Sequence, residues 1–214
     1  MKRLVVLLAL LVLLTAVGIW SWMAKPWEAW YAPTNDKHST TALRIERFDR
    51  VLDEYVSLGS YNALQRMNSE FPMQTKLLIE NVLELGSVDE PDIEKRLRYF
   101  YLDSTVQVIL DEVHRQYGDL SDVEAQLADS LKKLEHRHPA YRRPHLYAQI
   151  SCLKQSIVVS DTLIGISLDK YLGSDFPPYQ DFYSEEQRSQ MTRASIVSDA
   201  INAYDKYLQQ IENE

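Results

Sequence analysis

The chain has 214 residues, of which 45% are hydrophobic and 25% are charged. This length and composition favour one domain with a sizeable core. The formal net charge of −8 argues against nucleic-acid binding, because an acidic surface repels the phosphate backbone. The single cysteine, Cys152, excludes an intrachain disulfide and a zinc site built from several cysteines.

The amino terminus carries two basic residues followed by an apolar run over residues 4–24. As a helix, this run would be roughly 30 Å long, which matches the hydrocarbon core of a bilayer. We expect residues 1–24 to form a signal anchor in the cytoplasmic membrane, with the following domain on the periplasmic side, because Lys2 and Arg3 favour the cytoplasm. The alternative is a signal peptide with a cleavage site near Ala16 and Gly18, which would release the protein into the periplasm.

Residues 25–41 read "KPWEAWYAPTNDKHSTT" and show no helical period. We therefore expect a linker between the membrane segment and a domain over residues 42–214. Within this domain, apolar residues first recur at helical spacing in five segments. These segments are residues 43–59, 73–86, 89–103, 104–118 and 121–139.

Several residues mark the expected ends of these helices. Gly59 and Gly86 follow the first two segments and can adopt the left-handed conformation that often ends a helix. Ser121 and Glu124 have the spacing of a capping box, in which each side chain satisfies a backbone donor of the other. These signals predict about five helices in the first half of the domain.

The pattern changes at about residue 144, where Ile, Val, Leu and Tyr dominate and helix caps are missing. A break at Ser160 and Asp161 predicts short strands joined by tight turns. A final amphipathic stretch follows a capping box formed by Ser184 and Gln187. The predicted fold class is α+β and mostly α-helical, with helices packed on a small antiparallel sheet near residues 144–168 and an N-terminal membrane helix.

Four motifs follow one another in a characteristic order. They are "IERFDRVL" at residues 45–52, "SEFP" at 69–72, "LIGISLDKYLGSDFPPY" at 163–179 and "ASIVSDAINAY" at 194–204. In this order they resemble the gliding-motility lipoprotein family GldB of Bacteroidetes. The positions that carry the resemblance are Arg47, Phe48, Asp49, Gly165, Leu168, Asp169, Tyr171, Leu172, Gly173 and Asp199.

The chain departs from the family pattern in two ways. Members of the GldB family carry an acylated cysteine just after the signal peptide, whereas here the apolar run leads to Lys25, Pro26 and Trp27. Family members also continue well past the motif at residues 194–204. The resemblance therefore implies a shortened relative of the N-terminal half, with a different anchor.

The GldB family is distantly similar to predicted zinc peptidases. In those proteins a His-Glu-x-x-His helix holds zinc, and its glutamate acts on the metal-bound water. The corresponding helix here reads "RASIVSDAINAY", and no histidine follows His145. His136, His138 and His145 could gather a metal only if their arginine-rich loop folded back, so we expect solvated loop histidines, with no catalytic, metal-binding or cofactor-binding residues.

The aspartates are candidates for a catalytic pair, but each also has a structural explanation. We expect Asp161 to turn a hairpin and Asp169 to order the turn that follows Leu168. We expect Asp49 to pair with Arg47 or Arg50. These structural roles are preferred over catalysis.

Tyr171, Tyr179 and Tyr183 flank two prolines, and rigid rings on a turn are common in recognition surfaces. They either form a partner-binding patch or cover the end of the sheet. The preferred function is a non-catalytic protein of the cell envelope that contacts other envelope proteins in an assembly for gliding motility or secretion, as the resemblance implies. The alternatives are a divergent zinc-peptidase-like hydrolase and a degenerate copy that binds peptides along an exposed strand edge.

Overall fold

A computed structural model describes residues 43–213 of the chain. The expected membrane segment over residues 4–24 and the expected linker over residues 25–41 lie outside this part. Among residues 43–213, no helix combines the length and the apolar character needed to cross a membrane.

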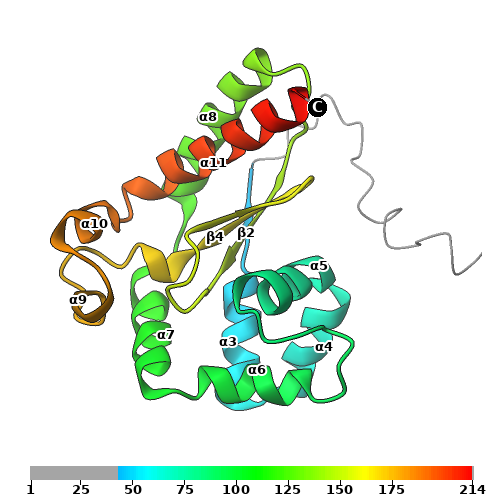
Figure 1. Cartoon of the computed structure of the whole chain (residues 1–214), viewed down its shortest axis with the longest axis vertical. Coiled ribbons are helices and arrows are strands. Elements are labelled where there is room, and N and C mark those ends of the chain that lie inside the picture. Colours follow the sequence, from blue (N-terminus) through cyan, green and yellow to red (C-terminus); the bar gives the residue numbers. More distant parts are fainter. Residues whose placement is uncertain (1–42, 214) are drawn as a thin grey trace, which may run out of the picture. The chain divides into compact units, whose positions relative to one another are not determined.

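The described part of the chain is mostly helical, with one small sheet (Figure 1). Its helices are α3 (Phe48–Leu58), α4 (Tyr61–Ser69), α5 (Pro72–Lys76), the π-helix η1 (Leu77–Val82), α6 (Ile93–Tyr101), α7 (Ser104–Gln116), α8 (Ser121–Arg137), the 3-10 helix η2 (Leu168–Lys170), α9 (Tyr179–Phe182), α10 (Glu185–Gln190) and α11 (Ser195–Glu212). Its strands are β1 (Ile45–Glu46), β2 (His145–Gln149), β3 (Ile157–Val159) and β4 (Leu163–Ser167).

Apolar spacing accounts for the first of these helices. Helix α3 buries Phe48, Leu52 and Val56 on one face. Gly59 ends it in the left-handed conformation, with a φ of 67° and its N–H bonded to the Tyr55 carbonyl oxygen at 2.8 Å. The predicted end of this helix is confirmed.

One predicted capping box is present and the other is not. Ser184 and Gln187 satisfy each other's backbone donors at the start of α10, as predicted. Helix α8 begins at Ser121, so this residue does not precede the helix as a cap. The Glu124 carboxylate instead accepts a hydrogen bond from the backbone N–H of Ile45 at 2.8 Å, and it therefore fastens β1 to α8.

The sheet has the strand order β1-β2-β4-β3. Its first three strands in this order are parallel, and β3 is antiparallel to β4. The α+β, mostly helical class is confirmed, but the prediction of an antiparallel sheet is wrong. The chain passes from the end of β2 to the outer strand β3, turns at Ser160 and Asp161, and returns as β4 between β2 and β3. Strand β4 therefore runs parallel to β2 and antiparallel to β3. The hairpin predicted at Asp161 is thus confirmed.

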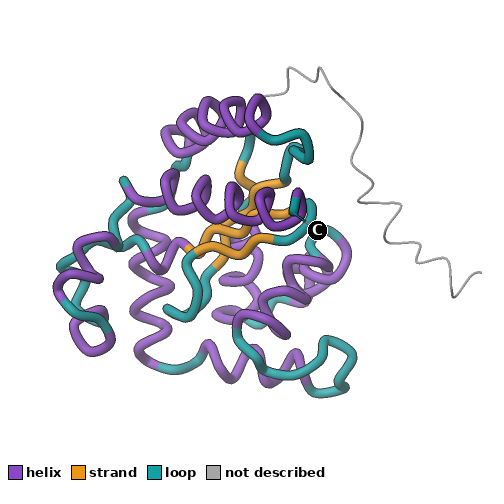
Figure 2. The backbone as a smooth tube through the Cα atoms, turned by 45° about the horizontal axis from the view of Figure 1, so that its top comes forward, coloured by secondary structure: helices purple, strands orange, loops and turns teal. Residues whose placement is uncertain are grey.

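Helices cover both faces of the sheet (Figure 2). Helix α3 packs on β2, where the rings of Phe48 and Tyr147 meet edge to face at 6.2 Å between centroids. Helix α11 packs on β3, β4 and α8. Gly165 on β4 lies beside Tyr147 in the register, and a Cβ at this glycine would lie 2.5 Å from the tyrosine ring. Its missing side chain is what lets the ring lie across the sheet.

Candidate functional site

The C-terminal ends of β1, β2 and β4 lie at the same edge of the sheet, because these strands are parallel. We call the segments that leave the strands there, residues 47–50, 150–153 and 168–173, the carboxyl edge. Two stretches of the family resemblance, which are distant in sequence, meet at this edge. A small pocket of about 290 Å³ lies beside it, between the start of α3 and the end of α7.

The first stretch is organised by an ion pair between Arg47 and Asp49. The Arg47 Nε donates to Asp49 Oδ1 at 2.9 Å, and its Nη2 donates to Oδ2 at 2.7 Å. Both carboxylate oxygens are occupied, and the Asp49 side chain is only 3% exposed. The expected pairing with Arg47 is confirmed, although the pair is partly buried at the sheet edge and does not lie on a helix surface.

The second stretch is organised by Asp169, which is completely buried. Its carboxylate accepts hydrogen bonds from the backbone N–H of Ser151 at 2.7 Å, from the Ser151 hydroxyl at 3.1 Å and from the backbone N–H of Leu153 at 2.6 Å. Burial raises the pKa of Asp169, and these hydrogen bonds oppose the rise. Asp169 therefore orders the crossover loop from β2 to β3 as well as the segment that contains it.

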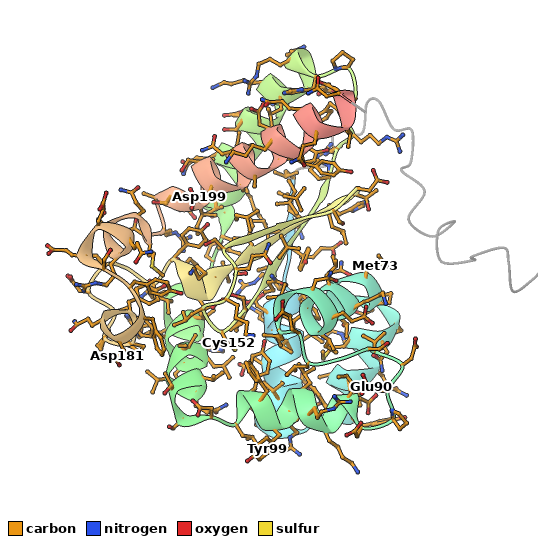
Figure 3. All side chains as sticks on the ribbon, in the orientation of Figure 1. Met73, Glu90, Tyr99, Cys152, Asp181 and Asp199 are labelled. Atoms are coloured by element: carbon orange, nitrogen blue, oxygen red, sulfur yellow. The ribbon has the colours of Figure 1, made fainter. Side chains whose placement is uncertain are left out.

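The crossover loop is held in an unusual backbone conformation. Cys152 and Leu153 have φ values of 52° and 67°, which side-chain-bearing residues seldom adopt. Burial also raises the pKa of the Cys152 thiol, so the protonated form dominates at neutral pH. Figure 3 shows Cys152 at the end of the sheet that faces α7. A thiol in this state is poorly suited to act as a nucleophile.

The three tyrosines singled out from the sequence lie in or against the core. Tyr171 and Tyr179 are 2% and 0% exposed, and Tyr183 is half-buried. The Tyr171 hydroxyl donates to Asp199 Oδ2 on α11 at 2.9 Å, and the Tyr179 hydroxyl donates to the Asp169 carbonyl oxygen at 2.6 Å. These residues close the end of the sheet, and in this conformation they do not form an exposed patch.

The remaining signature positions have structural surroundings as well. Phe48, Leu168 and Leu172 are buried in the core. Gly173 has a φ of 105°, and its N–H donates to the Met191 carbonyl oxygen at 3.0 Å. This bond fixes the loop after η2 against the segment before α11.

Within residues 43–213, β1 and β3 form the two outer edges of the sheet, and β3, with three residues against two in β1, is the longer. In the register with β4, Val158 lies opposite Gly165. On either side of Val158, the backbones of Ser156 and Ser160 form hydrogen bonds with those of Ser167 and Leu163. The alternation of an antiparallel ladder therefore points the backbone groups of Ile157 and Val159 outward. The Gln155 side chain occupies one of them, the Ile157 carbonyl, at 3.0 Å.

The three histidines that we expected to be solvated, rather than to bind a metal, differ in their surroundings. His136 is exposed at the end of α8, and His145 is exposed at the start of β2. His138 is buried and bonds to Asp205 at 2.8 Å and to Glu212 at 3.0 Å, so the expectation of a solvated histidine is wrong at this position. Over residues 43–213, no group of three or more His, Cys, Asp or Glu is arranged to hold a metal ion.

Comparison with known families identifies the chain. A family model described as "Gliding motility protein GldB" matches residues 32–214, which is most of the chain. The chain belongs to the GldB family. Searches of curated proteins and of solved structures gave no match. The resemblance drawn from the four motifs is thereby confirmed.

The GldB-family match includes every residue of the carboxyl edge. Two residues that hold this edge together were not predicted from the sequence. Ser151 supplies two of the donors to Asp169, and the hydroxyl of Tyr117, the residue directly after α7, donates to the Tyr171 carbonyl oxygen. No local pattern marks either residue, because each acts on a partner distant in sequence. At this edge of the GldB-family chain, Asp169 thus joins two of the three segments, and the carboxylates of Asp49 and Asp169 already accept hydrogen bonds.

Proposed function

We propose that this GldB-family chain is a non-catalytic protein of the cell envelope, and that it acts through contacts with other proteins in an assembly for gliding motility or secretion. Membership in the GldB family supports the envelope location and the link to gliding motility. The observation that carries the contact role is the open edge of β3. We further propose that residues 4–24 anchor the protein, with the domain on the periplasmic side.

The open edge of β3 offers both backbone and apolar contacts. An extended segment of a partner can add to such an edge through main-chain hydrogen bonds, with alternate side chains entering neighbouring pockets. Beside this edge, α11 packs on β3 and contributes the half-buried residues Val197 and Ile201. Ile157 and Val159 of β3 are half-buried too. The proposed partner segment is therefore extended and carries apolar residues at alternate positions.

The state of the carboxyl edge supports a non-catalytic role. A general base needs a free oxygen or nitrogen within reach of a substrate. The oxygens of Asp49 and Asp169 accept hydrogen bonds from Arg47, Ser151 and Leu153. Freeing the Asp169 carboxylate would break the hydrogen bonds that hold the crossover loop, and freeing Asp49 would break its ion pair with Arg47.

The test is cross-linking of the tagged full-length protein in its native membranes, followed by mass spectrometry of the captured proteins. Val159→Pro removes one outward N–H donor and places a ring at the edge, while the ladder bonds of Val158 remain. Val159→Thr has almost the same shape and keeps the N–H, so it is the matched control. We expect motility or secretion components to be captured by the parent and by Val159→Thr, and to be lost with Val159→Pro.

Capture that is equal for the two variants would refute the role of the β3 edge. Recovery of no envelope protein above background would refute the contact function as a whole. Circular dichroism of both variants shows whether the domain is still folded. The hydrolase alternative has its own measurement: stoichiometric zinc in the purified full-length protein, together with peptide cleavage, would replace the proposal with an enzymatic one.

A further inference from the structure

A second surface of the domain is an open groove of about 740 Å³, on the side of α7 away from the pocket at the carboxyl edge. One wall is α7, with Val108, Asp111 and Arg115 among its lining residues. The other wall is the loop after η2, residues 172–177, which includes the signature residues Leu172 and Gly173. This groove is separate from the edge of β3.

The groove is built from fixed walls. The Gln116 side chain on α7 donates to the Leu172 carbonyl oxygen at 2.8 Å and so ties the two walls together. The Phe176 ring packs edge to face on Tyr179, with 5.0 Å between centroids. Because Leu172 and Phe176 are 5% and 8% exposed, the loop wall belongs to the core and keeps its shape.

The surface of the groove combines apolar contacts with uncompensated negative charge. Val108 is a large apolar residue that is 50% exposed on the α7 wall. Arg115 pairs with Glu112 on the same helix. Asp111 and Asp175 lie on opposite walls, and no cation among residues 43–213 forms an ion pair with either of them.

One further cation, Arg188, contacts the loop wall and contributes to the charge near the groove. Arg188 does not line the groove, and its Nη1 donates to the Ser174 carbonyl oxygen at 3.3 Å. Even with this charge included, the three lining carboxylates outnumber the two guanidinium groups. The groove therefore favours a positively charged occupant.

We propose that this groove docks a segment of a partner protein in which lysine or arginine residues flank apolar side chains. The apolar side chains lie against Val108 and the loop wall, and the cations reach Asp111 and Asp175. Exposed charge pairs contribute modestly and are screened by salt, so binding weakens as ionic strength rises. The proposal does not depend on the edge of β3.

The test measures binding of two fluorescein-labelled peptides, GKLLKG and its charge-reversed counterpart GELLEG, to the purified full-length protein by fluorescence anisotropy. We expect GKLLKG to bind more tightly, and the double variant Asp111→Asn, Asp175→Asn to weaken its binding about fivefold. The matched control is the double variant Asp89→Asn, Asp129→Asn, which removes the same charge from two exposed positions outside the groove. This control is expected to leave binding unchanged.

Equal binding of the two peptides, binding of neither, or an equal loss in both double variants would overturn the proposal. A photo-cross-linking amino acid in place of Val108, introduced into the full-length protein in native membranes, identifies the natural occupant. A captured segment with lysine or arginine next to apolar residues supports the proposal. A captured segment without them, or a cross-link to residues 25–41 of the same chain, would contradict it.

Discussion

At the residue scale, the close packing of Tyr147 on Gly165 makes a direct prediction. In Gly165→Ala the new methyl carbon would lie 2.5 Å from the Tyr147 ring, which is fully buried, so the ring or the strand would have to shift within the core. Such overpacking is expected to destabilise the protein by about 1–3 kcal/mol in urea unfolding. The control is Gly118→Ala, where the added methyl meets nothing within 4 Å and the expected change is within about 0.5 kcal/mol. Equal unfolding midpoints would refute the assigned packing.

The hydroxyl of the same tyrosine supports a second prediction of opposite sign. Tyr147 Oη is buried and has no hydrogen-bond partner in the described part of the chain. Tyr147→Phe is therefore expected to stabilise the protein, by about 1 kcal/mol, because it removes a desolvated polar group. Tyr101→Phe is the matched control, since the Tyr101 hydroxyl donates to the Ile150 carbonyl oxygen at 2.5 Å. Its loss is expected to destabilise by about 1 kcal/mol. A loss of stability in both variants would show that Tyr147 has a partner after all.

At the scale of the elements, the ends of α8 and α11 are joined through one buried imidazole. His138 bonds through its two ring nitrogens to Glu212 and Asp205, and Arg137 lies 3.6 Å from the same Asp205 carboxylate. The hydrogen bond to Glu212, followed by that to Asp205, raises the pKa of His138 above its ordinary 6.5. The stabilisation is therefore complete below pH 6.5 and is lost as the pH rises through the higher folded-state pKa.

Glu212 titrates in the opposite sense. The hydrogen bond from His138 lowers its pKa below the ordinary 4.5, so its contribution is present above pH 4.5 and is lost as the pH falls through the lower folded-state pKa. The junction of α8 and α11 should thus be strongest between these two limits. His138→Gln is expected to lower the melting temperature at pH 6 more than at pH 8.5. In His136→Gln, which changes an exposed histidine on the same helix, the pH profile should match that of the parent. A profile unchanged by His138→Gln would contradict the assignment.

The elements also show where sequence analysis succeeded and why it failed elsewhere. Gly59 and the Ser184 capping box were predictable because both signals act within one turn of the helix that they limit. Helix α4 was missed because only Ala63 and Met67 on it are buried, which is too narrow a stripe to show a period. The parallel pairing of β2 with β4 was not predictable from local turns, because the crossover loop and β3 separate the two strands in sequence.

At the scale of the whole domain, the four motifs indicated the family, and the apolar spacing indicated the α+β class. Neither showed that two of the motifs reach the same edge of the sheet. Arg47 and Asp169 come to one edge of the sheet only because three strands are parallel, and the sequence offered no sign of this pairing. Likewise, the sequence left two alternatives open for the tyrosines, a binding patch or a cover for the end of the sheet, and the burial of Tyr171 and Tyr179 agrees with the second. Burial of a residue outside regular periodic elements depends on the tertiary fold, so the two proposed binding surfaces emerged only with the structure.

The uneven distribution of buried residues over the domain predicts where it opens first. Helix α10 has no buried residue, and α9 buries only Tyr179, whereas every residue of β4 is buried. Segments with few buried contacts open at a lower free energy than the core, so their amide hydrogens exchange sooner. Hydrogen exchange of the full-length protein, followed by mass spectrometry, is expected to show α10 exchanging well before β2 and β4. Unfolding of the core should then be cooperative, because the sheet is shared by the helices on both of its faces. Simultaneous exchange of α10 and β4 would instead mean that α10 unfolds only with the whole domain.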